Sequence, residues 1–584
     1  MIGSRSELIA KLIMPTWLFH KNLRIHLSHL ARASASLCKI QFQKSVIYEM
    51  IVRLSNFNIS LNESDDLIAQ RIIKQLSVQD KQLLSWEIVR KAIDARKRKD
   101  VHFVCSIECT LTDNTSPELS AQVVLVKNSQ LNVQRPKELS VTSKAKSHVI
   151  VIGAGPAGLF AALALIEAGK EVTLLERGKP VETRMRDIGR LRSRGELNTE
   201  SNVCFGEGGA GTYTDGKLYT RIKHPFVRWV LAEFVRFGAK ADILIDAHPH
   251  LGTDRLVKII KNMRHYLIEQ GVDYRFETRV DTLLTHEGQM TGVRTASGDE
   301  IQAEDVVLAI GHSARDTFEH LQAVGIALEA KDFAVGVRAE HEQDWVNQCQ
   351  FGEAANHPAL GAAEYSLTHQ VNDKDMGKRG VFSFCMCPGG LILPSPTEEG
   401  KMAINGMSNA KRSSPLANSG IVVQVTPQDI SNHGLGDDPL CGIRLQRELE
   451  EKTFQATTQA YAAPAMRVSD FVNHKHTGKL AFSRFKPAVE AVDLRTILPD
   501  WLSNPLREGI QAFDRKMKGF VTDNANLLAV ESRTSSPIRI TRGSDMQSIN
   551  IKGLYPAGEG AGYAGGIVSA AVDGLKAAAF IINK

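Results

Sequence analysis

Residues 148–178 read HVIVIGAGPAGLFAALALIEAGKEVTLLERG and decide the expected fold of this 584-residue chain. A buried-strand run, a glycine-rich turn, a small-residue helix and a second strand follow one another within about 30 residues, the length of a βαβ unit. Gly153, Gly155 and Gly158 form the pattern G-x-G-x-x-G, and Glu176 ends the second strand. The stretch therefore predicts a Rossmann-like, dinucleotide-binding unit.

Each residue type in this stretch has a physical reason. Gly153 permits a tight turn, Gly155 lets the backbone approach a pyrophosphate, and Gly158 allows close packing of helix on strand. The helix N-terminus directs unpaired N–H groups at the phosphates. Glu176 can accept hydrogen bonds from ribose hydroxyls and would repel a 2′-phosphate. The predicted cofactor-binding residues of this unit are Gly153, Ala154, Gly155, Pro156, Ala157, Gly158 and Glu176.

A second glycine-rich loop before a helix lies at the other end of the chain, where residues 554–576 read LYPAGEGAGYAGGIVSAAVDGLK. Small residues recur along this helix at i, i+3, i+4 and i+7, which suits close packing on a sheet. A second helix N-terminus is a second favourable place for negative charge. Two such sites favour one long cofactor over two small ones.

These motifs resemble a known family. GAGPAG (153–158), LAIGH (308–312) and YPAGEGAGYAGG (555–566) are similar to motifs of the glutathione-reductase-type FAD superfamily. The more specific resemblance is to the bacterial uncharacterized FAD-dependent dehydrogenases, and it spans about residues 50–584. The segments that carry it are FGEGGAGTYTDGKL (205–218), FAVGVRAEH (333–341), FCMCPGG (384–390) and ESRTSSPIRI (531–540).

The resemblance implies FAD and further cofactor-binding residues. Arg177 would flank the adenine, Val280 would lie on a strand beneath it, and Glu559 stands where the superfamily has Asp beside the ribityl chain. A helix starting at Gly565 would direct its N-terminus at the flavin and stabilise its anionic reduced form. The residues implied in this way are Arg177, Gly209, Lys217, Val280, Gly311, Gly558, Glu559, Gly565, Gly566 and Ile567.

Five residues are candidates for chemistry or contacts beside a flavin. Cys385 and Cys387 form C-x-C, which suggests dithiol redox chemistry, although alternate residues of a strand share one face and two sulfurs can simply pack there. Arg533 is a candidate clamp for a substrate carboxylate or a member of a loop ion pair. His312 follows a strand end and is interpreted either as a general acid–base group or as a structural histidine. Lys217 is interpreted either as a contact to flavin or phosphate or as an ordinary surface lysine.

Composition and charge narrow the classes of protein. The chain is 23% charged and 43% apolar, typical of a globular protein of two to four domains. Residues 1–48 hold seven Lys or Arg and one acid, which accounts for the whole net charge of +6. The neutral remainder lacks the electrostatic footprint of a nucleic-acid-binding protein. No apolar stretch is long enough for a membrane span, and neither a disulfide framework nor zinc-ligand spacing is visible.

The basic segment at the start is kept apart from the fold. Three interpretations stay open: a dispensable extension, an organellar transit peptide, or sequence upstream of a true translation start at Met50. A secretory signal fits worse, because Lys11 and Pro15 interrupt the apolar stretch of this segment. A cytoplasmic location is expected, with organellar targeting by residues 1–48 as the alternative.

We predict an α/β protein: a Rossmann-like FAD-binding domain with an inserted mixed α+β substrate domain and a small N-terminal α/β domain. In that small domain, strands are expected near 50–61 and 101–111, with a helix capped by Ser64 and a second helix near 86–95 whose end carries the basic run 96–99. The expected domains are 1–49 (extension), 50–111 (small α/β domain), 112–146 (connector with a strand near 122–126), 147–330 with 521–584 (FAD-binding domain) and 331–520 (substrate domain).

The expected function is an FAD-dependent oxidoreductase that transfers a hydride between flavin and an unidentified small molecule, with NAD(P)H as a possible transient donor. One alternative is a flavoprotein with structural or sensory FAD and a partner-binding N-terminal domain. The other is a flavin-dependent enzyme that modifies nucleic acid, against which the neutral main body argues. No metal, nucleic-acid or membrane partner is expected, and the sequence does not indicate an oligomeric state.

Overall fold

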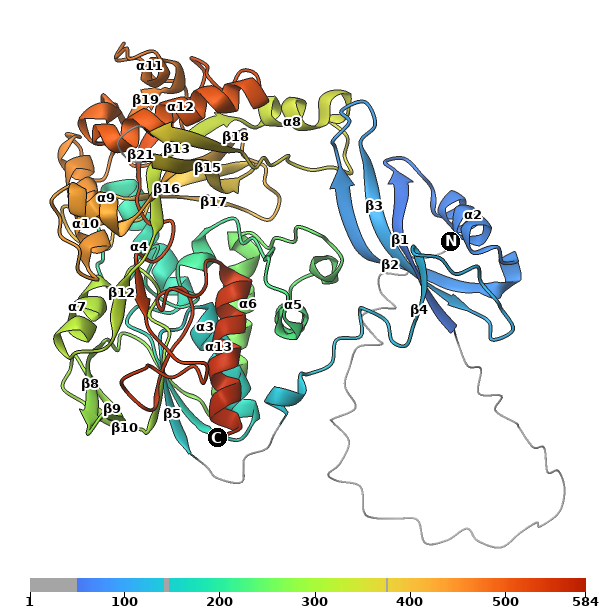
Figure 1. Ribbon diagram of the computed structural model, residues 1–584, viewed down its shortest axis with the longest axis horizontal. Helices are drawn as coiled ribbons and strands as arrows, with labels where there is room; N and C mark the ends of the chain where they lie inside the picture. The colour runs from blue at the N-terminus through green and yellow to red at the C-terminus, as the bar shows by residue number, and fades with distance from the viewer. Residues whose placement is uncertain (1–49, 141–146, 374–376) are drawn as a thin grey trace, which may run out of the picture. The chain divides into compact units, whose positions relative to one another are not determined.

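A computed structural model describes residues 50–140, 147–373 and 377–584. The described chain forms an N-terminal antiparallel sheet, a parallel sheet of Rossmann type and a seven-stranded, mostly antiparallel sheet (Figure 1). The predicted fold class, α/β with a Rossmann-like domain and further sheets, is confirmed. Among the described residues, no helix combines the length and apolarity needed to cross a membrane. The first 49 residues, and with them the predictions for that segment, lie outside the described residues.

The N-terminal sheet has four strands in the order β2-β3-β1-β4 and carries one helix, α2. Ser64 caps α2 as predicted, its side chain accepting a hydrogen bond from the N–H of Leu67. Ile68, Ile72 and Leu76 of this helix are buried. The elements are β1 (Met50–Ser60), α2 (Asp65–Leu76), η1 (Asp80–Gln82), β2 (Leu83–Asp94), β3 (His102–Leu111) and β4 (Val123–Val126).

Three predictions for this region are wrong. The helix expected near 86–95 is strand β2, because its Ile88, Val89 and Ile93 suit a pleated surface and the strand pairs with β3 along its length. The basic run 96–99 is consequently part of the β2–β3 connection and no helix end. Strand β4, which was assigned to the connector 112–146, pairs with β1, so the small domain extends beyond residue 111.

The Rossmann-type sheet has five parallel strands in the order β23-β11-β5-β6-β7. The first and last βα units of this sheet meet here, since helices α3 and α13 lie side by side (Figure 1). Their contact is so close that a Cβ at Gly574 would come within 2.0 Å of the Ala157 carbonyl oxygen. The strands are β5 (His148–Ile152), β6 (Glu171–Leu175), β7 (Asp273–Arg275), β11 (Asp305–Leu308) and β23 (Leu554–Pro556).

Helices and a small antiparallel sheet, β10-β9-β8, complete this part of the chain. The helices are α3 (Pro156–Glu167), α4 (Val181–Arg194), α5 (Pro225–Arg236), α6 (Thr253–Glu269), α7 (Arg315–Ala323) and α13 (Ile567–Ile582), and the 3-10 turns are η2 (Lys137–Leu139), η3 (Ala210–Tyr213) and η4 (Ala241–Leu244). The small sheet consists of β8 (Val280–His286), β9 (Gln289–Thr295) and β10 (Glu300–Gln302).

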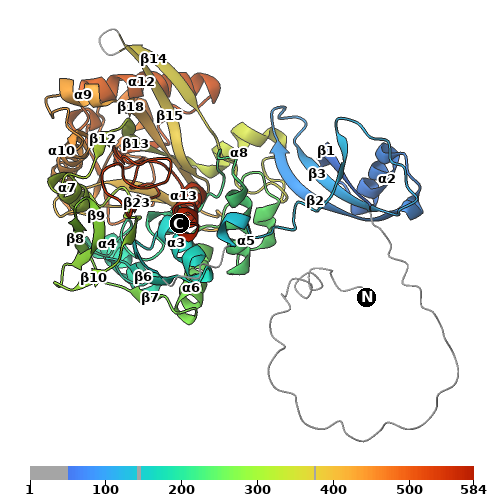
Figure 2. The same ribbon diagram turned by 60° about the horizontal axis from the view of Figure 1, so that its bottom comes forward.

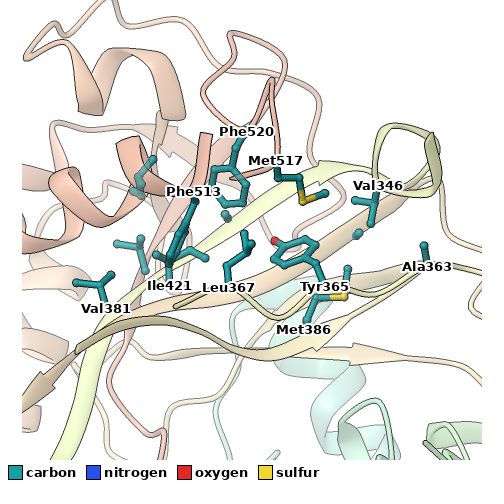
Figure 3. Packing of buried hydrophobic residues seen from close by; sticks show 14 of the residues in the cluster. Val346, Ala363, Tyr365, Leu367, Val381, Met386, Ile421, Phe513, Met517 and Phe520 are labelled. Atoms are coloured by element: carbon teal, nitrogen blue, oxygen red, sulfur yellow. The ribbon is translucent and has the colours of Figure 1, made fainter. Parts of the chain in front are cut away.

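The inserted region is built on a seven-stranded sheet in the order β14-β15-β18-β13-β21-β19-β20. Helix α12 (Asp500–Lys516) packs on strands β13, β14, β15 and β18 (Figure 2). Aromatic and aliphatic side chains, among them Tyr365, Phe513 and Phe520, fill the space between helix and sheet (Figure 3). The strands are β13 (Phe333–Glu342), β14 (Thr368–Asp373), β15 (Gly377–Cys387), β18 (Leu416–Val425), β19 (Ala463–Arg467), β20 (Val489–Ala491) and β21 (Asn526–Glu531).

The position of strand β21 shows that the expected end of the insertion at residue 520 is wrong. The prediction placed 521–584 in the FAD-binding domain, but β21 pairs with β13 and β19 in the centre of the seven-stranded sheet. The remaining elements of this region are β12 (Leu328–Ala330), β16 (Gly390–Pro394), β17 (Ile404–Ser408), β22 (Ile538–Ile540), α8 (Gln343–Phe351), α9 (Pro427–Asn432), α10 (Cys441–Gln455), α11 (Val468–Val472), η5 (Gly352–Ala354) and η6 (Leu494–Thr496).

Candidate functional site

A cavity of about 370 Å³ is lined by residues of both the Rossmann-type region and the seven-stranded sheet. Its size is within the range of small-molecule and cofactor sites. Most of the predicted site residues line it, although they come from segments 400 residues apart. Those that line it are Gly153, Gly155, Pro156, Ala157, Glu176, Arg177, Gly209, Lys217, Val280, Gly311, His312, Cys385, Arg533, Glu559, Gly565, Gly566 and Ile567. Ala154, Gly158, Cys387 and Gly558 are not in the lining.

The three glycines of the first motif serve different needs. Gly153 has φ +99°, and a Cβ there would lie 2.4 Å from the Ala309 carbonyl oxygen. At Gly158 a Cβ would lie 1.8 Å from the Gly153 carbonyl oxygen, so this glycine is required by packing alone. At Gly155 the nearest atom to a Cβ is the Gly209 Cα at 3.9 Å, and the residue faces the cavity. Gly155 therefore leaves room for a ligand at the start of α3.

Glu176 lines the cavity and also holds the turns around it. Its carboxylate accepts hydrogen bonds from the backbone N–H groups of Ala154 (2.9 Å), Gly178 (2.8 Å) and Gly206 (3.0 Å). The carboxylate thus ties the first motif to the glycine-rich loop 205–211. A carboxylate has about four acceptor positions, so one remains for a ribose hydroxyl.

Arg177 lies over the ring of Phe205, 4.1 Å from the centroid, and pairs with Glu200 (2.8 Å) and Asp316 (3.0 Å). Burial opposes the charge of this guanidinium, but the two carboxylates outweigh it and raise the pKa of Arg177. Val280 lines the same cavity. The wall near Arg177 is thus fixed by ion pairs and one aromatic ring.

Arg184, in α4, was not singled out in the sequence, yet it shapes the glycine-rich loop. Its fully buried guanidinium donates hydrogen bonds to five carbonyl oxygens, and burial lowers its pKa. Nothing in the sequence marks it among the many basic residues of α4, because its partners become neighbours only in the fold. The carbonyls belong to Asn202, Val203, Gly206, Glu207 and Gly209.

The second glycine motif meets the first at this cavity. Helix α13 starts after Gly566, and Gly565 and Gly566 line the cavity. The Gly558 N–H donates to Asp573 (2.8 Å), which leaves the next residue, Glu559, in the cavity wall. The N-termini of α3 and α13 therefore both face one cavity, and each is a favourable position for negative charge.

His312 and Glu559 form a pair in the cavity wall. The His312 Nδ1 lies 3.5 Å from a Glu559 carboxylate oxygen, and the imidazole is largely buried. A carboxylate beside one ring nitrogen fixes the tautomer and orientation of the ring. This arrangement suits a group that exchanges a proton at Nε2.

Arg533 and Lys217, two predicted ligand contacts, are held by carboxylates. Arg533 binds the fully buried Glu450 through Nε (3.0 Å) and Nη2 (2.8 Å). Lys217 pairs with Glu364 and lies 3.5 Å from Asp215. Both side chains line the cavity, so they contribute charges whose positions are fixed by ion pairs.

Cys385 and Cys387 are separated by a β-bulge. Residues 384 and 387 oppose Gly420 and Asn418 of β18, so β15 carries one extra residue there, and Cys385 has φ +41°. Cys385 lines the cavity, whereas Cys387 is fully buried behind it. The regular strand on which the sequence interpretation of the two cysteines rests is therefore interrupted at this position, and a bulge redirects a side chain.

The arrangement fits an FAD. An elongated dinucleotide needs a pyrophosphate position at a helix N-terminus, an acid near the ribose, and a second favourable site for the flavin end. Gly155, Glu176 and the start of α13 supply these in one cavity. Within residues 50–140, 147–373 and 377–584, no group of three or more His, Cys, Asp or Glu is placed to hold a metal ion.

Comparison with known families agrees with this site. Residues 148–186 match the FAD binding domain model, 230–341 a pyridine nucleotide-disulphide oxidoreductase model, and 332–534 the model described as FAD-dependent protein, C-terminal domain-like. Residues 50–110 match a domain of unknown function. The fold and the site thus define a protein of FAD-dependent oxidoreductase type.

One relative shows the family. An uncharacterized protein of Clostridium beijerinckii is 39% identical over 541 residues, which cover 92% of this chain and 99% of the relative. The chain belongs to the same family, a family of FAD-dependent proteins.

Other similarities are weaker. A digeranylgeranylglycerophospholipid reductase of Haloferax volcanii is 26% identical over 196 residues, 31% of this chain and 41% of that protein. A flavoprotein/dehydrogenase structure from Cytophaga hutchinsonii aligns with 75% of this chain and 80% of its own, at 13% identity and a TM-score of 0.29. A TM-score this low supports no conclusion about function.

Proposed function

We propose that the protein is an FAD-dependent oxidoreductase that transfers a hydride between the flavin and a small-molecule substrate. One observation carries the proposal: the N-termini of α3 and α13 face the same cavity as Cys385, His312 and Arg533. FAD, when bound, supplies the capacity to accept or donate a hydride. The chain's own groups then hold the cofactor at one wall and present side chains for proton exchange and substrate binding at the other.

The chain's residues have distinct roles in this proposal. The start of α13 favours negative charge on the group beside it, since unpaired N–H groups lie at a helix N-terminus. His312, oriented by Glu559, holds or releases a proton at Nε2. Arg533, held by Glu450, presents its Nη1 side, which now donates to Thr397 (2.9 Å), toward polar groups of a substrate.

NAD(P)H is the proposed electron donor, binding transiently without a domain of its own. The match of 230–341 to a pyridine nucleotide-disulphide oxidoreductase model supports this choice. A small-molecule substrate, a cytoplasmic location and the absence of nucleic-acid or membrane partners remain predictions.

An anaerobic titration with NADH and then NADPH tests the proposal, with the visible flavin absorption band as readout. Rapid bleaching by either nucleotide is expected. A protein that dithionite bleaches but neither nucleotide does would refute the nicotinamide donor and move the search to organic substrates. A colourless protein that cannot be reconstituted with FAD would refute the function itself.

A further inference from the structure

The bulge in β15 brings two thiols together beside the cofactor cavity. The Cys387 thiol donates a hydrogen bond to the Cys385 carbonyl oxygen, which lies 3.3 Å from its sulfur. Only Cys385 lines the cavity; Cys387 is fully buried. The pair thus has one residue in the cavity wall and one buried behind it.

A buried cation lies against the pair. Arg338 donates from Nη2 to the Cys385 carbonyl oxygen (2.7 Å), and the same Nη2 is 3.8 Å from the Cys387 sulfur. Glu531 (2.6 Å) and Asn418 (3.0 Å) fix this guanidinium on its other side. The cation is therefore held beside the sulfurs and is available to stabilise a thiolate.

The electrostatics separate the two sulfurs. The neighbouring Cys387 side chain, helped by Arg338 against the effect of burial, lowers the pKa of the Cys385 thiol. The neighbouring Cys385 side chain and burial raise the pKa of the Cys387 thiol well above its usual value. Thiol–disulfide exchange needs an attacking thiol that ionises readily and a second thiol close to it, and the two shifts match this division of roles.

Another pair of cysteines in the chain shows what simple packing looks like. Cys105 and Cys109 are buried in strand β3 of the N-terminal sheet. Burial raises the pKa of Cys105 to about 11 and that of Cys109 to about 12. Buried thiols of this kind are inert, and the contrast with Cys385 argues against packing as the only role of the C-x-C pair.

We propose that Cys385 and Cys387 form a dithiol–disulfide centre that exchanges two electrons with the flavin, an inference that rests on the proposed function. In the reducing direction, the S–S bond accepts two electrons and one proton from the reduced flavin and a second proton from solvent. The bond breaks, two thiols form, and the flavin becomes oxidised. In the reverse direction, the two thiols release two electrons and two protons while the S–S bond forms.

The first test is independent of the flavin. Trypsin cleavage after Arg379 and Lys401 releases a peptide, residues 380–401, whose only cysteines are Cys385 and Cys387. Full-length protein, with and without FAD, is equilibrated in glutathione buffers of increasing oxidising strength and alkylated without reduction. We expect the alkylation of Cys385 and that of Cys387 to disappear together as the buffer becomes more oxidising. The peptide should then be lighter by two hydrogen atoms than the reduced, unalkylated peptide, as a disulfide between the two cysteines requires. Two thiols that persist, or a thiol that becomes glutathionylated or sulfenylated alone, would overturn the proposal.

The second test connects the centre to the flavin. Oxidised holoprotein is titrated anaerobically with dithionite, and uptake of about four electrons per FAD is expected, because flavin and disulfide each take two. Cys387→Ser and Cys385→Ser are both expected to lower the uptake to about two. Cys349→Ser, which removes a partly exposed thiol in α8, is the matched control and should retain about four.

The outcomes separate the two proposals. Equal uptake in wild type and both variants would overturn the dithiol centre and leave the FAD-dependent function in place. A protein without reducible flavin whose 380–401 peptide still loses both thiols would refute the proposed function, and with it the electron exchange, while keeping the disulfide.

Discussion

The two sheets that face the cavity present polar groups to it in different ways. The parallel sheet uses backbone: the starts of α3 and α13, where Gly155 and Gly566 keep side chains out of the way. The region of the seven-stranded sheet uses charged side chains held in buried ion pairs, such as Arg533 with Glu450. Backbone recognition depends on glycines at fixed spacing and is visible in a sequence, whereas an ion pair between distant residues becomes visible only in the fold.

The largest expected loss of stability concerns the charged side chains in and behind the cavity wall. Glu450→Gln would leave Arg315 and Arg533, both buried, without the carboxylate that now binds each of them. Loss of one partner from a buried ion pair costs about 3–5 kcal/mol. Chemical denaturation should show a decrease of this size in the free energy of unfolding.

Glu451→Gln is the matched control for that change. Glu451 is the next residue in α10, is half exposed and pairs with Lys401 at 2.6 Å. Its removal should alter the free energy of unfolding by less than about 1 kcal/mol. Equal losses in the two variants would contradict the importance of the buried cluster.

An acid-dependent loss of stability is expected from His341 in β13. The ring is fully buried between Trp345 and Phe520, and burial lowers its pKa from 6.5 to about 4. The unfolded chain therefore binds a proton that the folded chain excludes, so this contribution is complete above pH 6.5 and is lost as the pH falls toward 4. The loss is on the order of 3 kcal/mol.

Comparison with His341→Gln isolates this effect in unfolding curves recorded across that pH range. Glutamine keeps an N–H donor for the Phe520 carbonyl, which the imidazole Nε2 now contacts at 2.9 Å, but does not titrate. Burial raises the pKa values of Glu207 and Glu340 to about 7, which produces a slope of opposite sign in both proteins. Identical pH dependence in wild type and variant would refute the prediction.

Gly158→Ala tests how closely helix α3 packs beside the glycine-rich turn of the parallel sheet. The new Cβ would lie 1.8 Å from the Gly153 carbonyl oxygen, so helix α3 must move away from its strand. Overpacking of this kind costs about 1–3 kcal/mol. Thermal unfolding of the apoprotein is the measurement, and an unchanged midpoint would show that α3 is not held as closely as described.

Gly155→Ala has the smallest expected effect on stability and sharpens the comparison most. Its Cβ meets no atom closer than 3.9 Å and points to the space where a ligand would lie. Stability of the apoprotein should change by less than about 1 kcal/mol, while FAD affinity should fall at least tenfold, or about 1.4 kcal/mol. Fluorescence titration of apoprotein with FAD measures the affinity, and unaltered binding would contradict the placement of the cofactor at Gly155.

Local sequence was a good guide where local interactions determine the structure. The βαβ unit at 148–178 and the helix after Ser64 were predicted, because turn glycines and capping residues act over a few positions. It was a poor guide at 86–95, where apolar spacing is compatible with helix or strand and pairing with β3 decides. It was also a poor guide at β21, which is isolated in sequence from the sheet that it joins.

The sequence by itself determined that two glycine-rich turns precede helices, that an acid follows the first unit, and that two cysteines stand one residue apart. Those features follow from backbone sterics and from residue spacing within short segments. Only the tertiary structure decided that both helix starts face one cavity, that Arg338 lies against the Cys387 sulfur and the Cys385 carbonyl oxygen, and that a bulge separates the two cysteines. Those contacts join residues far apart in the chain, and the energy that selects them comes from burial and ion pairing across the whole fold.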